Sequence, residues 1–64
     1  MITVNGVEHE FSGLTVVSLL EQLSIETRGV AVAVNGVIVT RSNWPSTSIP
    51  DQSAVEILTA AAGG

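Results

Sequence analysis

The fold of this chain is decided in the stretch VAVAVNGVIV, residues 30–39. Asn-Gly between two apolar runs is a strong hairpin signal, because a type I′ turn needs positive φ at both central residues and this pair tolerates it. The stretch therefore predicts a hairpin in which residues 30–35 pair with residues 37–40. Val and Ala alternate along the first arm, so it is apolar on both faces, as expected for a strand away from a sheet edge.

The tetrapeptide Val-Asn-Gly-Val at the centre of that hairpin also occurs at residues 4–7. It predicts a second hairpin, in which residues 2–5 pair with residues 7–11. We interpret the repetition as the same turn chemistry used twice, not as a structural repeat.

Between the hairpins, apolar residues at i, i+3, i+4 and i+7 predict a helix that begins after Thr15 as its N-cap. The stripe consists of Val16, Leu19, Leu20 and Leu23. Gly29 ends the connection to the second hairpin. Residues 40–51 hold two prolines and many hydroxyl and amide side chains, which predicts a loop with room for one helical turn.

Residues 54–58 resume a strand pattern, with Val55 and Ile57 on one face and Glu56 and Leu58 on the other. The order of elements is then hairpin, helix, hairpin, loop and strand, which predicts an α+β domain. A single helix can cover only one face of such a sheet, so the other face should stay partly open.

The composition excludes several classes of protein. The chain has 64 residues, no cysteine and a net charge of −4. Its negative charge would repel phosphate backbones, which argues against nucleic-acid binding. No apolar run approaches the roughly 18 residues of a membrane span, and no leader pattern opens the chain, so we expect a cytoplasmic protein with no membrane segment. Arg28 and Arg41 are too few for an anion cradle and are expected to be solvated.

Catalytic side chains are scarce. The triplet Glu8-His9-Glu10 suggests a metal or acid–base site, but neighbours on a strand point to opposite faces and cannot converge on one ion. With one histidine and no cysteine, no nucleophilic triad is possible. We therefore expect that the chain is not an enzyme and that His9 is a structural residue of an edge strand.

The last residues, 59–64, have the sequence TAAAGG and follow a folded domain predicted at residues 1–58. Such small side chains bury little surface, and glycine loses the most conformational freedom when it is ordered. The reactive group that remains is the terminal carboxylate. The alternative is a frayed terminus with no function.

Several short features together make the chain similar to a known family. In order, they are Ile2-Thr3-Val4-Asn5-Gly6, Leu19-Leu20, Val32-Ala33-Val34-Asn35-Gly36, Arg41 with Trp44, Val55-Glu56-Ile57 and Gly63-Gly64. They resemble the ThiS family of ubiquitin-like sulfur carriers, over essentially the whole chain. The resemblance implies the β-grasp fold, a mixed sheet of about five strands with one helix on one face and with the first and last strands parallel at the centre. Residues 51–53, Asp-Gln-Ser, depart from the acidic residue, Gly and Asp that are common in the family.

The same resemblance implies a carrier that partner enzymes act on. A ThiF-like adenylating enzyme would use ATP and Mg²⁺ to form an acyl-adenylate at Gly64, and the chain itself would bind no cofactor. A sulfur donor system would convert the adenylate to a thiocarboxylate, and the carrier would donate its sulfur to a ThiG-like thiazole synthase. Gly63 and Ala62 are slim enough to thread into a narrow partner site.

Two candidate sites for partner binding lie in the folded domain. Leu58 is expected beside the tail on the uncovered face, where it could form an apolar docking patch with Ala31 and Ala33. Trp44 could anchor a partner, because tryptophan is frequent in binding hot spots, or it could plug one end of the core.

Three other functions stay open at this point. The small subunit of molybdopterin synthase shares the fold and the diglycine end. A ubiquitin-like modifier would form isopeptide bonds after the same activation step. A plain interaction module would have an incidental terminus.

Overall fold

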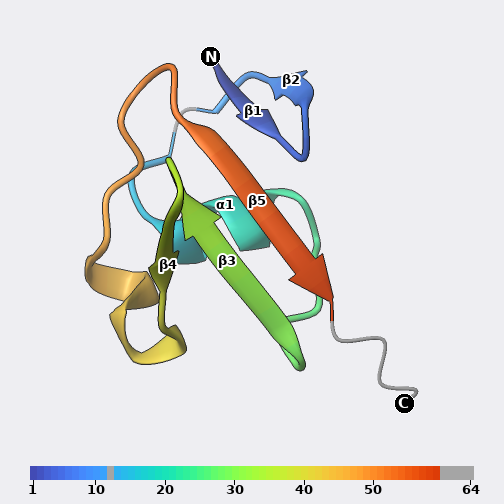
Figure 1. The fold of residues 1–64 in the computed structure, drawn as a ribbon, viewed down its shortest axis with the longest axis vertical. Helices are drawn as coiled ribbons and strands as arrows, with labels where there is room; N and C mark the ends of the chain where they lie inside the picture. The colour runs from blue at the N-terminus through green and yellow to red at the C-terminus, as the bar shows by residue number, and fades with distance from the viewer. Residues whose placement is uncertain (12, 60–64) are drawn as a thin grey trace.

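The structure is a computed structural model, and it describes residues 1–11 and 13–59. Five strands form one mixed sheet in the order β2-β1-β5-β3-β4, with the helix α1 (Val16–Gln22) on one face (Figure 1). β1 and β5 run parallel, whereas the other neighbouring pairs are antiparallel. The architecture implied by the resemblance is therefore confirmed. The strands are β1 (Ile2–Val4), β2 (Val7–His9), β3 (Val30–Val34), β4 (Val37–Val39) and β5 (Ala54–Thr59).

Both predicted hairpins form, and both turn where Asn-Gly was expected to turn. φ is 51° at Asn5 and 84° at Gly6, and it is 51° at Asn35 and 86° at Gly36. Positive φ at both central residues is the signature of the predicted type I′ turn. The second arm of the first hairpin is shorter than predicted, because β2 ends at His9.

The predicted helix is also confirmed. The Thr15 hydroxyl accepts a hydrogen bond from the Ser18 N–H at 3.2 Å, so it satisfies one of the amides that the first turn leaves free. The helix ends one residue before Leu23, which is half-buried against the core. The core between α1 and the sheet consists of Ile2, Val4, Val16, Leu19, Leu20, Val32, Val34, Val39, Trp44, Ile49, Val55 and Ile57.

The turn-rich segment after β4 holds more helix than predicted. A 3₁₀-helix, η1 (Arg41–Ser46), spans six residues, or about two turns at three residues per turn. The Arg41 guanidinium lies 5.3 Å from the centroid of the Trp44 ring and donates a hydrogen bond to the Thr27 carbonyl. Arg41 is exposed, as predicted, and the ring and the carbonyl are additional partners of its guanidinium.

The turn before β5 is tight, although its sequence departs from the family pattern. Gln52 adopts a φ of 71°, a conformation that glycine adopts more easily, and its N–H donates to the Met1 carbonyl at 2.8 Å. Ser53 is buried and its hydroxyl donates to the Pro50 carbonyl at 2.6 Å. These hydrogen bonds close the turn and direct the chain into β5. Among the described residues, none of the helices is long and apolar enough to cross a membrane.

Candidate functional site

The strand β5 lies in the middle of the sheet and leads toward the C-terminus (Figure 1). Val55 and Ile57 are buried in the core, whereas Glu56 and Leu58 are exposed on the opposite face, as predicted. The strand ends at Thr59, one residue beyond the domain boundary expected from the sequence. The site residues predicted in the tail, Ala62, Gly63 and Gly64, lie outside the described residues.

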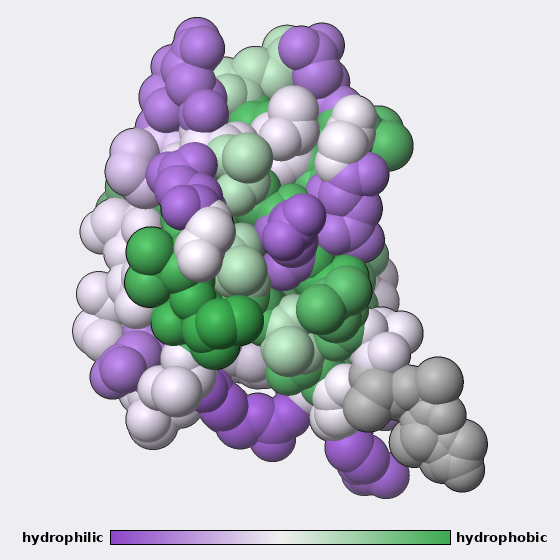
Figure 2. Space-filling view, viewed as in Figure 1, coloured by the Kyte–Doolittle hydropathy of each residue, from purple (hydrophilic) through white to green (hydrophobic). Residues whose placement is uncertain are grey.

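The sheet face opposite α1 carries exposed apolar side chains beside the end of β5. Ala31 is the register partner of Leu58, and Ala33 is the partner of Ile38. These four residues are called the open-face patch below. Leu58 and Ile38 are each 66% exposed, with the smaller alanines between them. Figure 2 looks onto this face and shows hydrophobic surface over β3 and β4 and around the end of β5.

The three predicted patch residues thus lie together on the uncovered face, and Ile38 joins them. The sequence held the signal for Ile38. A two-residue type I′ turn at Asn35-Gly36 pairs Val34 with Val37 and therefore pairs Ala33 with Ile38.

The charged strand residues on the open face are both acidic. Glu56 is the register partner of Ala33, and Glu8 is the register partner of Thr3. Both carboxylates are exposed. Glu56 adjoins the patch, whereas Glu8 lies two strands from β5, at the level of Ala54. An apolar patch with an acidic neighbour complements a partner surface that has a basic group beside an apolar centre.

Trp44 does not belong to this surface. Its side chain is 3% exposed, and its Nε1–H donates to the Val39 carbonyl at 3.0 Å. The prediction that Trp44 anchors a partner is therefore wrong, because a ring already buried in the core offers no area to a partner. The alternative, a plug at one end of the core, describes its role.

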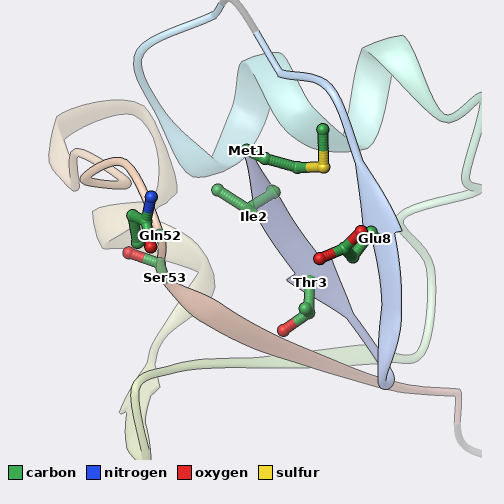
Figure 3. Close-up of a pocket in the computed structure, with 6 residues that line it drawn as sticks. All are labelled: Met1, Ile2, Thr3, Glu8, Gln52 and Ser53. Carbon is green, nitrogen blue, oxygen red and sulfur yellow. The ribbon is translucent and has the colours of Figure 1, made fainter.

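A small hollow of about 150 Å³ lies near the start of β5. Figure 3 shows Thr3 and Glu8 from neighbouring strands on one side of it and Gln52 and Ser53, which precede β5, on the other. Glu8 supplies the only side-chain carboxylate of its lining. Across the described residues, no group of three or more His, Cys, Asp or Glu side chains could hold a metal ion. One carboxylate in the lining is fewer than the three or four protein ligands that a zinc ion takes.

The triplet Glu8-His9-Glu10 does not converge on one point. His9 is the register partner of Ile2, which is buried on the core side, whereas Glu8 pairs with Thr3 on the open face. His9 is half-buried on the edge strand β2, as predicted.

Comparisons with known proteins give consistent similarities. The model of the ThiS family matches residues 2–64. A thiazole synthase from Paramagnetospirillum magneticum is 36% identical over 64 residues, which are 98% of this chain but 20% of that protein. The chain therefore spans about a fifth of the length of the curated relative that it matches.

Two solved structures of a thiamine biosynthesis protein from Geobacter metallireducens are similar over 98% of the chain, at 34% sequence identity. The crystal structure, of the protein called ThiS, has a TM-score of 0.83 and is covered to 97% of its length. The solution structure has a TM-score of 0.77 and is covered to 86%.

Proposed function

This chain belongs to the ThiS family, and we propose that it is a sulfur carrier for thiazole formation in thiamin biosynthesis. The match over residues 2–64 carries the proposal, because it includes the C-terminal segment on which the chemistry depends. The similar structures come from a thiamine biosynthesis protein, which favours this route over molybdopterin synthesis.

The reacting group in this proposal is the main-chain carboxylate of Gly64. A carboxylate is a poor electrophile, so a ThiF-like partner first joins it to the α-phosphate of ATP, and pyrophosphate leaves with Mg²⁺. Hydrosulfide, or a donor that supplies its equivalent, then attacks the acyl carbon. The bond from that carbon to the phosphate oxygen breaks, AMP leaves, and the thiocarboxylate remains.

The carrier's part in this chemistry is to present a slim peptide end. The adenylate must be kept from water, so the partner site has to close around the peptide. Gly63 and Gly64 have no Cβ and Ala62 has only a methyl group, so a narrow channel can admit all three. The catalytic groups belong to the partners.

A thiazole synthase is the proposed acceptor of the sulfur. The relative from P. magneticum that carries this name contains a segment similar to 98% of this chain. Two modules on one polypeptide meet at a high effective concentration, which favours functions that operate in sequence. This supports a direct transfer from the carrier to the synthase.

The open-face patch is the proposed docking surface for these partners. It lies beside the end of β5, so a partner that covers Leu58 also stands next to the tail. The exposed carboxylate of Glu56, which adjoins the patch, favours a partner with a basic group at the rim of its binding surface.

The intact mass of the protein isolated from cells tests the carrier function. A carrier gains the mass difference between sulfur and oxygen on its C-terminal residue, and a variant that lacks Gly64 does not. High-mass conjugates would indicate a modifier instead, and an unchanged mass under thiamin starvation would contradict both. A deletion strain should require thiamin while its molybdenum enzymes stay active.

A further inference from the structure

The repeated Val-Asn-Gly-Val motif does more than turn the chain. The Asn35 Oδ1 accepts a hydrogen bond from the Ala54 N–H at 2.9 Å, at the start of β5. The Asn5 Oδ1 accepts from the Ile57 N–H at 2.8 Å, and its Nδ2 donates to the Ile57 carbonyl at 3.1 Å, near the end of β5. Both asparagine side chains therefore hold the backbone of the strand that leads to the tail.

The Asn5 side chain contacts β5 at a point beyond the end of β1, where β5 has a strand neighbour only on the β3 side. The last register pair of β1 with β5 is Val4 with Val55, and the last backbone hydrogen bond on that side runs from the Asn5 N–H to the Val55 carbonyl, at 2.9 Å. β5 continues beyond this point to Thr59. On the other side, β3 pairs with β5 as far as Thr59. Asn5 thus extends the β1 side of the ladder by one step, with a side-chain amide in place of a backbone amide.

Only an amide side chain fits this position well. It supplies one donor and one acceptor, as a peptide group does, so it satisfies both backbone groups of Ile57. Asn also tolerates the φ of 51° that the turn requires at this residue. An aspartate would keep the acceptor but would place a second oxygen, without a proton, against the Ile57 carbonyl.

We propose that Asn5 is a positioning residue for sulfur loading, because it fixes the direction in which β5 delivers the tail to the adenylating partner. The inference rests on the proposed function of Gly64. A strand end held on both sides has less freedom to lose when the partner binds the tail. Once the tail is bound, the reacting carbonyl has the same surroundings in wild type and in an Asn5 variant. Asn5 should therefore affect KM more than kcat.

The chain offers a matched control for this proposal. Asn5→Gly and Asn35→Gly both keep a residue that accepts positive φ, and both remove an asparagine that bonds to β5. Only the first change lies beside the end of the strand. The assay is pyrophosphate release by the ThiF-like partner, at a temperature at which all the variants are folded by circular dichroism.

Asn5→Gly should raise KM about fivefold with kcat within about twofold, whereas Asn35→Gly should leave KM within about twofold of wild type. Asn5→Asp should resemble Asn5→Gly. The proposal is wrong if the two glycine variants raise KM equally, since the effect would then follow stability alone, or if Asn5→Gly leaves KM unchanged.

Amide hydrogen exchange tests the same inference without the partner. Exchange of the Ile57 amide should become about tenfold faster in Asn5→Gly, while the Ala54 amide should respond in Asn35→Gly. Unchanged exchange at Ile57 would overturn the positioning role. If the wild-type chain is never adenylated but the two glycine variants show these changes in exchange, the proposed function is refuted. The role of Asn5 in holding β5 would then still stand.

Discussion

Replacing Leu58 by Asp should weaken partner binding by about tenfold or more. Full burial of a leucine side chain contributes about 1.5–3 kcal/mol. Because Leu58 is 66% exposed in the free protein, docking can gain about two thirds of that amount, or about 1–2 kcal/mol. The variant loses this gain and must also remove a carboxylate from water, and each 1.4 kcal/mol or so corresponds to about a tenfold change in Kd.

Leu14→Asp is the matched control for this change. Leu14 is 74% exposed, but it lies in the segment before α1 and not on the sheet. Both variants should stay folded, because neither side chain is in the core. Isothermal titration against the ThiF-like enzyme should give a raised Kd for the Leu58 variant alone. An unchanged Kd for Leu58→Asp, or an equal loss in both variants, would refute the assignment of the docking surface.

Three further variants test the C-terminal tail, the burial of Trp44 and the close packing around Gly13. Gly63→Leu should abolish adenylation, because the side chain blocks a narrow channel, while the circular dichroism spectrum stays that of wild type; near-normal pyrophosphate release would contradict the threading proposal. Trp44→Phe should lower the free energy of unfolding by about 1–3 kcal/mol in urea titrations, because the Val39 carbonyl loses its donor, and partner affinity should not change; weaker binding would show that Trp44 contacts the partner. Gly13→Ala should cost about 1–3 kcal/mol, because its Cβ would lie 2.7 Å from the Phe11 ring and 2.8 Å from the Ser18 Cβ; an unchanged melting temperature would show that these groups move aside freely.

Local signals determined the elements of this protein. The two Asn-Gly turns, the alternation in β3 and β5 and the apolar stripe after Thr15 each depend on residues a few positions apart. Short-range sterics and hydrogen bonding act within such a span, so sequence patterns predict them well. The open-face patch follows from the same alternation, since parity alone places Leu58 opposite Val55 and Ile57.

Contacts between distant residues were decided only by the tertiary structure. Parallel pairing of β1 with β5 was implied by family resemblance, since propensity contains no information on which strands meet. The sequence allowed Trp44 to face either a partner or the core. In the structure its side chain is buried in the core and bonds to the Val39 carbonyl of β4. The sequence predicts Asn5 only as a turn residue, yet its side-chain amide forms hydrogen bonds with the backbone of Ile57, 52 positions away. Such a role exists only once the sheet brings the two segments together.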